Sequence, residues 1–592
     1  MKKTLKGLSA ILMTSVLAVS ASAATVGSMT AWASTNTITI NLPTNDKATH
    51  TYEAYQVFKG DLSSGVLSNI TWGDHVDQSP LLAALAADTA FQITNTDAAA
   101  ITTTSSAADV AKYLSVHNDA TTAKKFADHV NASLNSTAAI TGSFTAATTS
   151  TAASAVIDVT TPGYYLVKDK DNSLATTDAN GAYTKFILKV VGPETVTAKE
   201  DVPSITKKIV QGSSEVSANT ASIGDVIPYV LHSSVPDMTN FDSFCYVIND
   251  TMEAGLTFND DVTINIGTDT LVNKNTLTTS EALAANPKWF EVQTGAAADG
   301  YSFQIVLNNF KQYTKDTEIT VNYSATLNQK AELYTNSNDN TASLTFSNNP
   351  NYDYSGNNEP GSGAPKGITP GSKTETFTTA IKAIKVDGKT TTTKLSGAVF
   401  RLSGSGLSVV KVDSDYFKRD DTNGTYYQRK NGTYTTTEPT SSTADSYVST
   451  TAKYVKVKDT TEQGTLQYVD TYVTSDTNGV ISFKGLAPGT YTLTEITPPP
   501  TYNALSQPIT ITITGNATNS GWTASANIEG TNTNLTLNSD EYFEFNIANN
   551  KGVTLPGTGG VGTTIFYIIG GLMISGALVL LIVKKRMSIK EK

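Results

Sequence analysis

An apolar run near the C-terminus, Ile565–Val583, constrains this 592-residue chain more than any other feature. The run contains no charged residue and is long enough to cross a bilayer, at the short end of the range that membrane helices use. The basic cluster that follows, Lys584-Lys585-Arg586, would stay on the cytoplasmic side. The preceding residues must therefore fold outside the membrane or be removed.

The N-terminus has the pattern of a secretory signal. Lysines at positions 2, 3 and 6 precede an apolar stretch from Leu8 to Ala24. Small residues allow cleavage after Ala23 or after Ala33, and the strand-like sequence that follows favours Ala33. We therefore assign residues 1–33 to the signal and expect an extracellular protein.

A single cysteine, Cys245, excludes an internal disulfide. Stability outside the cell must then come from packing or from another covalent link. The formal net charge is −11, which favours solubility and argues against nucleic acid as a partner, because nucleic-acid binding needs a basic face.

The first folded block, residues 34–200, mixes strand and helix signals. Alternating apolar residues predict strands near its start and at 163–167 and 185–191. Ser106 and Asp109 resemble a capping box ahead of a helix. The block is expected to be an α+β domain.

The rest of the extracellular chain is nearly all strand signal, which predicts a mainly β protein of tandem immunoglobulin-like sandwiches. We expect a middle sandwich at 201–350 and a C-terminal sandwich at 374–553. The Asn/Gly/Pro-rich residues 351–373 between them predict a linker or a long surface loop. Residues 554–592 form the C-terminal tail with the membrane helix.

Both sandwiches place a lysine, an acid and an asparagine on apolar strand faces. Strand alternation puts Lys207, Asp250 and Asn348 on inward faces of the middle block. The same alternation applies to Lys385, Glu495 and Asn549 in the C-terminal block. Neighbouring residues of the same types are the alternatives at these positions: Lys208, Lys382, Asn349 and Asn550.

Such burial suggests chemistry, because Lys, Asp and Glu are rarely buried without a partner. Desolvation favours the neutral amine, which is a nucleophile, and keeps a carboxylic acid protonated. The amine could attack the asparagine amide while the acid gives a proton to the departing ammonia. Spacing alone leaves open that these residues are solvated strand ends or ordinary buried ion pairs.

Several segments resemble Gram-positive surface proteins. Lys385-Val386-Asp387, the run KLSGAVFRL from Lys394 and the run YTLTEITPP from Tyr491 resemble CnaB-type domains. The run GDVIPYVL, from Gly224, resembles the middle domain of sortase-assembled backbone pilins. This resemblance implies two isopeptide bonds: Lys207–Asn348 with acid Asp250, and Lys385–Asn549 with acid Glu495.

The segment Leu555-Pro556-Gly557-Thr558-Gly559 resembles the LPXTG cell-wall sorting signal. The resemblance implies that a sortase cuts between Thr558 and Gly559 and holds Thr558 as a thioester. Lys199 lies in a weak variant of the pilin motif, with Ala198 in place of the usual proline. Its place before the second block implies the acceptor role, although a solvated linker lysine would look the same.

The first block departs from this pattern. Asp169 lies where Glu495 lies relative to a Pro-Gly pair, but the closing strand offers no asparagine. We therefore expect no isopeptide bond there and the lowest stability of the three domains.

The main functional hypothesis is a pilus shaft subunit, joined through Thr558 to Lys199 of the next copy. The alternative is a monomeric wall-anchored adhesin, or a tip or basal pilin, that binds a host glycan or matrix protein. Expected partners are a pilin-class and a housekeeping sortase, further copies, minor pilins and peptidoglycan. The scattered histidines and Cys245 show no metal-ligand or nucleophile–base spacing, so we expect no metal, no cofactor and no enzyme.

Overall fold

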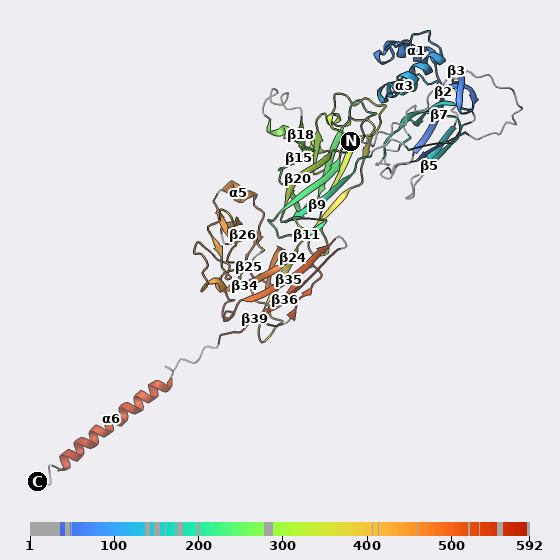
Figure 1. Cartoon of the computed structure of the whole chain (residues 1–592). Coiled ribbons are helices and arrows are strands. Elements are labelled where there is room, and N and C mark those ends of the chain that lie inside the picture. The colour runs from blue at the N-terminus through green and yellow to red at the C-terminus, as the bar shows by residue number, and fades with distance from the viewer. Residues whose placement is uncertain are drawn as a thin grey trace, which may run out of the picture.

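The computed structural model shows three β-rich domains in a row, followed by one long helix (Figure 1). It describes residues 36–552 and 561–588, except 42–45, 47, 49, 136–141, 147–153, 160, 172, 175–180, 198–201, 278–287, 405, 413, 459, 519–520 and 532. The mainly β fold expected from the alternating sequence is confirmed. The signal residues 1–33 lie outside the described residues.

The first domain has two sheets and a helical cap. One apolar cluster, with Ile38 and Tyr165, lies between the two sheets, and a second, with Phe58 and Phe126, lies under the helices. The capping box at Ser106 and Asp109 is confirmed. The elements are β1 (Asn36–Asn41), β2 (His50–Ser63), β3 (Val66–Trp72), α1 (Gln78–Ala87), α2 (Ala107–Val116), α3 (Ala120–Ala132), β4 (Gly142–Ala146), β5 (Ser154–Val159), β6 (Gly163–Asp169), β7 (Lys185–Val190) and β8 (Glu194–Thr197).

The middle domain is a sandwich of two large sheets. Their orders are β10-β9-β12-β20-β15-β16, with β14 on β20, and β11-β23-β21-β13-β19-β18-β17, with β22 on β21. The strands are β9 (Ile205–Gln211), β10 (Ser214–Val216), β11 (Ala218–Thr220), β12 (Val226–Ser234), β13 (Tyr246–Met252), β14 (Leu256–Phe258), β15 (Thr263–Ile266), β16 (Asp269–Thr270), β17 (Val272–Asn273), β18 (Trp289–Thr294), β19 (Phe303–Leu307), β20 (Glu318–Leu327), β21 (Asn338–Ser347), β22 (Lys366–Ile368) and β23 (Ser372–Phe377).

Residues 351–373 are not a linker between domains. Strands β22 and β23 both pair with β21, so this segment completes the middle domain. Tyr354 within it is buried against Cys245 and donates its hydroxyl to Pro365 O at 2.7 Å. One buried tyrosine and two short strands are enough to fix a segment whose composition is typical of loops.

The third domain pairs its first and last strands in parallel, with Asp387 of β24 opposite Asn549 of β39. Its main sheets have the orders β33-β24-β39-β38 and β32-β25-β34-β35-β36-β37, and the insert forms separate small sheets. The elements are β24 (Thr379–Asp387), β25 (Val399–Gly404), β26 (Val409–Val412), β27 (Asp415–Arg419), β28 (Tyr427–Gln428), β29 (Tyr434–Thr435), β30 (Tyr454–Val457), α5 (Thr460–Thr465), β31 (Val469–Asp470), β32 (Tyr472–Thr474), β33 (Val480–Leu486), β34 (Gly489–Thr497), β35 (Ile509–Thr518), β36 (Gly521–Ile528), β37 (Thr533–Asn534), β38 (Thr536–Leu537) and β39 (Phe543–Asn549).

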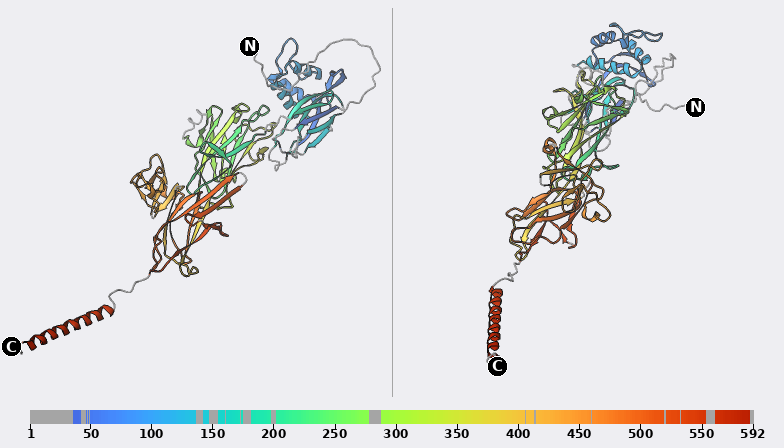
Figure 2. Two further views of the ribbon diagram at one scale, coloured as in Figure 1. Left: turned by 60° about the horizontal axis from the view of Figure 1, so that its bottom comes forward. Right: turned by 90° about the vertical axis from the view of Figure 1, so that its left-hand side faces the viewer.

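The middle and third domains share one continuous apolar core. The backbone N–H of Ile223 donates to Gly485 O at 3.0 Å, and Phe377 stacks on Trp522 with ring centroids 5.5 Å apart. A Cβ on Gly485 would lie 2.2 Å from the Ile223 side chain, so only glycine fits this close approach. Figure 2 shows the three domains in line in two further views.

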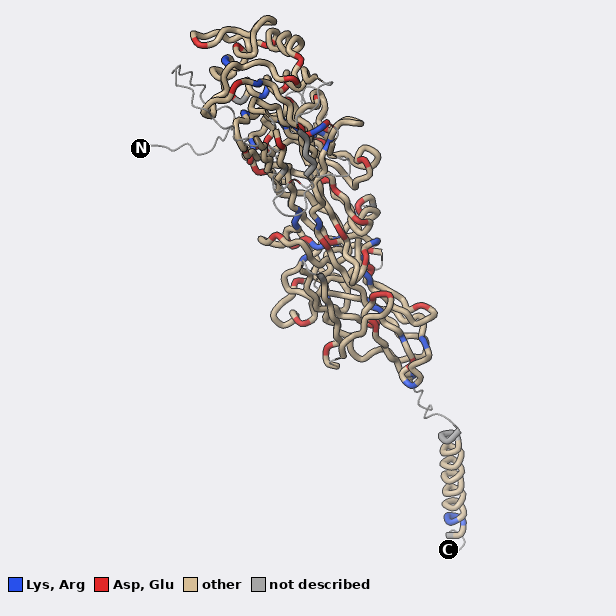
Figure 3. The backbone as a smooth tube through the Cα atoms, turned by 90° about the vertical axis from the view of Figure 1, so that its right-hand side faces the viewer, with Lys and Arg blue, Asp and Glu red and all other residues tan. Residues whose placement is uncertain are grey.

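Helix α6 (Val561–Ser588) lies beyond the third domain. Its segment Ile565–Met587 contains an 18-residue window with a mean hydropathy of 2.5 and is long enough to cross a membrane. Lys585 and Arg586 lie in its last turn, and Figure 3 shows this basic end of the helix. The expected membrane-held precursor is confirmed by this helix together with the anchor motif reported below.

Candidate functional site

The third domain brings all three expected residues of its trio together. Lys385 on β24 donates to Asn549 Oδ1 on β39 at 2.5 Å. Asn549 Nδ2 donates to Glu495 on β34, at 2.9 Å to Oε1 and 3.1 Å to Oε2. The amine also lies 3.3 Å from Glu495 Oε1. Nucleophile, amide and acid are therefore in direct mutual contact.

This trio is closed to solvent. The side chains of Lys385 and Glu495 are 0% and 1% exposed, and the Lys385 Nζ lies 5.6 Å from the ring centroid of Phe400. Burial lowers the pKa of Lys385, partly offset by the Glu495 charge. The site thus favours the neutral, nucleophilic amine more than water does.

The middle domain brings two of its three expected residues together. Lys207 on β9 lies 2.7 Å from Asp250 Oδ2 on β13, and both side chains are fully buried. Burial lowers the pKa of Lys207 to about 8 and raises the pKa of Asp250. The aromatic rings of Tyr229 and Tyr323 cover the amine, with centroids at 5.0 and 5.3 Å.

The expected partner Asn348 lies elsewhere, so that prediction is wrong. Its Nδ2 donates to Gly181 O of the first domain at 3.1 Å, and its backbone O accepts from Tyr183 N at 2.7 Å. The reason is strand register: β13 and β21 run antiparallel with Asp250 opposite Ala342. Asn348 is six residues further along, about 20 Å from this level of the sheet.

The structure puts a different asparagine at the trio, Asn340. It lies on the same face of β21, two residues before Ala342, and its side chain is fully buried. Asn340 Nδ2 donates to the hydroxyl of Tyr323 at 3.2 Å, and that hydroxyl donates to Asp250 Oδ2 at 2.5 Å. Among the described residues, Asn340 Oδ1 and Asp250 Oδ1 are buried without hydrogen-bond partners, which is a costly arrangement.

The first domain replaces this chemistry with a histidine between two acids. His50 Nδ1 lies 2.8 Å from Asp169 Oδ1, and its Nε2 lies 3.1 Å from Asp46 Oδ2, with all three side chains fully buried. Asp169 also accepts from Thr184 N at 2.7 Å. Burial raises the pKa of Asp169. Asp46, His50 and Asp169 thus form a titratable cluster, with a histidine where the other two domains have a lysine.

One lysine of the first domain contacts both an asparagine and an acid. Lys168 donates to Asn131 Oδ1 at 3.0 Å and lies 2.9 Å from Asp171. The Asp171 side chain is 68% exposed, so water reaches the acid. The Lys168 side chain itself is only 4% exposed, so this trio differs from the other two in the exposure of its acid.

The sorting motif Leu555-Pro556-Gly557-Thr558-Gly559 and the acceptor Lys199 lie outside the described residues. The structure describes the residues on either side of 198–201. Strand β8 ends at Thr197 on the edge of the first domain, and Val202 is buried in the core that begins the middle domain. Lys199 therefore belongs to the short connection between two folded domains.

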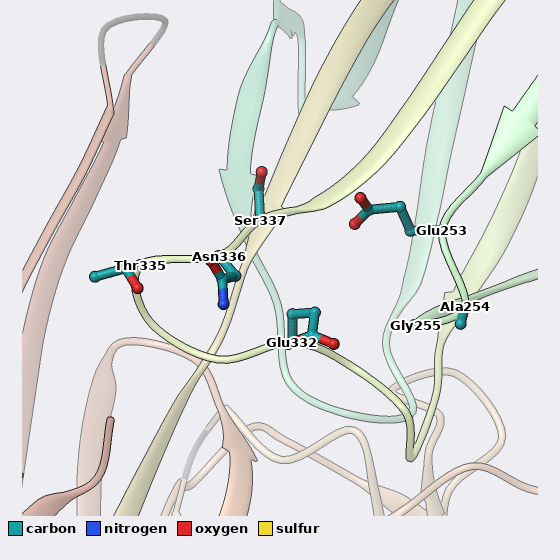
Figure 4. Close-up of a pocket in the computed structure, with 7 residues that line it drawn as sticks. All are labelled: Glu253, Ala254, Gly255, Glu332, Thr335, Asn336 and Ser337. Atoms are coloured by element: carbon teal, nitrogen blue, oxygen red, sulfur yellow. The ribbon is translucent and has the colours of Figure 1, made fainter. Parts of the chain in front are cut away.

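A hollow of about 530 Å³ lies beside the joint of the middle and third domains (Figure 4). Glu253 and Glu332 are the charged residues of its lining. Glu253 accepts from Asp339 N at 3.0 Å, a contact between residues 86 positions apart in the sequence. Lysine, histidine and cysteine are absent from the described lining, which gives this hollow no nucleophile–base pair.

Three parts of the chain match protein-family models. Residues 223–358 match the Gram-positive pilin backbone subunit 2, Cna-B-like domain. Residues 460–529 match the SpaA prealbumin-like fold domain, and residues 547–588 match the LPXTG cell wall anchor motif. The first match contains Asp250, Tyr323 and Asn340, and the second contains Glu495.

The chain is 27% identical over 415 residues to the trypsin-resistant surface T6 protein of Streptococcus pyogenes serotype M6, covering 66% of this chain and 70% of that protein. Among solved structures, the T6 backbone pilin of the same organism aligns over 88% of this chain and 99% of its own, with 15% identity and a TM-score of 0.49. The major pilin SpaA of Corynebacterium diphtheriae aligns over 87% and 100%, with 14% identity and a TM-score of 0.42.

Proposed function

We infer that this chain, one of the LPXTG-anchored backbone pilins of Gram-positive bacteria, is the shaft subunit of a covalent surface pilus. The observation that carries this proposal is the presence, in one chain, of the pilin backbone domain and the LPXTG anchor. Sortase cuts the anchored precursor and joins it to other pilin subunits and to the cell wall. The protein is a structural subunit and not an enzyme.

Two internal isopeptide bonds stabilise the subunit in this proposal. In the third domain Lys385 Nζ attacks Cγ of Asn549, the C–N bond to Nδ2 breaks, and ammonia leaves. One proton passes from Nζ to Glu495 and one from Glu495 to the departing nitrogen, so the acid ends as it began. In the middle domain Lys207 and Asn340 react in the same way with Asp250 as the acid.

The product explains why charged groups are tolerated in these cores. An amine and a primary amide become one neutral secondary amide, which removes the cost of burying a charged lysine. The curated relative is called trypsin-resistant. Two closed loops, each spanning most of a domain, would give this chain the same property, since cleavage needs locally unfolded backbone.

Polymerisation uses Thr558 as acyl donor and Lys199 as acceptor. An acceptor amine must be reachable by a sortase-bound thioester, and the place of Lys199 in the sequence between the first two domains supports this role. A pilin-class sortase would join the copies, and a housekeeping sortase would transfer the base of the fibre to peptidoglycan. Minor pilins and a host glycan or matrix protein complete the proposed partners.

Intact-mass measurement of the full chain tests the internal chemistry. The expected mass is lower than the sequence mass, after signal removal, by two ammonia molecules. The Lys168–Asn131 contact should contribute no third loss, because its acid is exposed. A mass equal to the sequence mass would refute both bonds.

The polymer is tested on cell-wall extracts separated by size. The native chain should give a high-mass ladder, and Lys199→Ala should give only the monomer. Lys208→Ala is a suitable control, since Lys208 lies on the outer face of β9 and donates to Ser217 at 2.7 Å. A single band from the native chain would instead support a monomeric wall-anchored adhesin.

A further inference from the structure

The acid of the middle-domain trio is separated from the asparagine by a tyrosine hydroxyl. Asp250 Oδ2 lies 2.7 Å from Lys207 Nζ and 2.5 Å from Tyr323 Oη. The same hydroxyl lies 3.2 Å from Asn340 Nδ2. A continuous row of short contacts therefore leads from the attacking amine, through acid and phenol, to the nitrogen that must leave.

The third domain has a different arrangement. Glu495 contacts both the Lys385 amine and the Asn549 amide directly, at 3.3 and 2.9 Å. One carboxylate can therefore exchange protons with both reacting nitrogens. In the middle domain, the contact between the acid and the amide nitrogen passes through Tyr323 instead.

We propose that Tyr323 is the proton relay of cross-linking in the middle domain. This inference deepens the isopeptide chemistry proposed above and depends on it. As Nζ bonds to Cγ of Asn340, its proton moves to Asp250. The protonated acid donates to the Tyr323 oxygen, and the Tyr323 proton moves to Nδ2, which leaves as ammonia. Tyrosine and aspartate both end in their starting protonation states.

The surroundings of Tyr323 support a fixed relay. Its ring stacks on Tyr229 at 5.3 Å and meets the edge of Phe303 at 5.2 Å, so its hydroxyl has little freedom to swing away. Tyr323 is 3% exposed, and Lys207, Asp250 and Asn340 are 0–1% exposed. Bulk water does not reach the leaving nitrogen, so the proton must come from a side chain.

The relay also explains a buried hydrogen bond that packing does not require. A phenylalanine at position 323 would make the same ring contacts with Tyr229 and Phe303. Only the hydroxyl reaches Asp250 and Asn340. Burial and the neighbouring Asp250 raise the pKa of Tyr323, which keeps the proton on the phenol until a strong acceptor forms.

The test is Tyr323→Phe in the full chain, followed by the time course of ammonia loss after synthesis in a cell-free reaction. Peptide mass spectrometry assigns the loss to the peptide pair containing Lys207 and Asn340. We expect cross-linking to slow by roughly a hundredfold, the lower end of what positioned acid–base groups contribute. The third-domain bond should form at its normal rate in the same molecule.

The matched control is Tyr246→Phe. Tyr246 is also a fully buried tyrosine of the middle domain, but its hydroxyl contacts Ser233 at 2.5 Å, away from the trio. This variant should cross-link as fast as the native chain. Folding of the middle domain is checked with a thiol reagent, since Cys245 is fully buried and reacts only when the domain opens.

The outcomes distinguish failure of the Tyr323 relay from failure of the Lys207–Asn340 bond itself. Native-like cross-linking in Tyr323→Phe would overturn the relay and leave the bond intact, whereas a native chain that never loses ammonia here would overturn the bond itself. Should Cys245 become reactive in Tyr323→Phe, a fluorinated tyrosine at position 323 decides. Its more acidic hydroxyl should speed the reaction, and an unchanged rate would again overturn the relay.

Discussion

Asp169 in the first domain and Glu495 in the third domain occupy equivalent strand positions, each seven residues after the proline of a Pro-Gly pair. Both carboxylates are buried, but their partners differ. Glu495 meets Lys385 and Asn549, which can condense, whereas Asp169 meets His50. An imidazole and a carboxylate can share a proton but cannot form a stable amide, so the first domain keeps a titratable contact.

Lys168 shows that residue types alone do not make a cross-linking site. It contacts an asparagine and an acid at distances similar to those in the third domain, yet its acid is largely exposed. The two proposed cross-linking trios differ from it in the burial of the acid and not in residue types. Burial of the acid is therefore the property that distinguishes the two proposed cross-linking sites from the Lys168 cluster.

The largest expected effect comes from removing the third-domain bond. Lys385→Ala or Asn549→Ala opens a loop closed over a separation of 164 residues. By the chain-entropy relation for cross-links, this loss should destabilise the domain by roughly 5 kcal/mol. Guanidinium unfolding of the full chain measures the loss.

Lys382→Ala is the control for this experiment. Lys382 lies on the same strand but pairs with Glu544 at 3.2 Å on the solvent side. Its loss should cost less than about 1 kcal/mol. Equal destabilisation by Lys382→Ala and Lys385→Ala would remove the distinction between a linked and an unlinked lysine.

A smaller effect is expected from pH in the first domain. Because the pKa of Asp169 is raised, the folded state holds its proton more tightly than the unfolded state does. The first domain should therefore lose stability as pH rises through the raised pKa and gain stability as pH falls through it. Asp88, with its pKa lowered to about 2, stays ionised in the mildly acidic range and does not oppose the change.

Thermal unfolding of the first domain should occur a few degrees higher at about pH 5 than at about pH 7.5. Asp169→Asn should remove most of this difference. If the native chain and the variant respond equally to pH, the cluster of Asp46, His50 and Asp169 does not titrate in this range, and its contrast with the linked domains disappears.

The smallest effect distinguishes Asn340 of β21 from Asn348, the residue that follows this strand. Asn348→Ala removes the Gly181 contact between the first and middle domains and should cost about 1 kcal/mol at that joint. It should leave the mass deficit unchanged, while Asn340→Ala should remove one ammonia loss. A changed deficit in Asn348→Ala would restore the original assignment of the cross-link.

Strand alternation in the sequence was sufficient to predict Lys207, Asp250, Lys385, Glu495 and Asn549 as buried, and the structure brings each lysine to its acid. It could not choose between Asn340 of β21 and Asn348, which follows the strand by one residue, because alternation assigns both to the same face. The choice depends on register, which the pairing of Asp250 with Ala342 sets. Asp250 lies near the end of β13, and an antiparallel neighbour places the start of its own strand there. The start of β21 is where Asn340 lies.

Two other features needed the folded structure. His50 lies 119 residues from Asp169 in sequence, and only the pairing of β2 with β6 brings them together. Residues 351–373 have the composition of a loop, but β22 and β23 add to a sheet edge that local sequence does not reveal. Both cases depend on long-range contacts, which local patterns do not encode.

The position of Lys199 after the first domain has a mechanical consequence for the proposed fibre. With the next copy attached there, tension enters between Thr197 and Val202 and leaves beyond Asn549. The first domain would then lie outside the covalent path between these two points. The middle domain would transmit force from Lys207 straight to Asn340, and the third from Lys385 to Asn549, so the loops they enclose could not be drawn out. A shaft assembled in this way would stretch little, with its unlinked domain free to unfold and refold at the side.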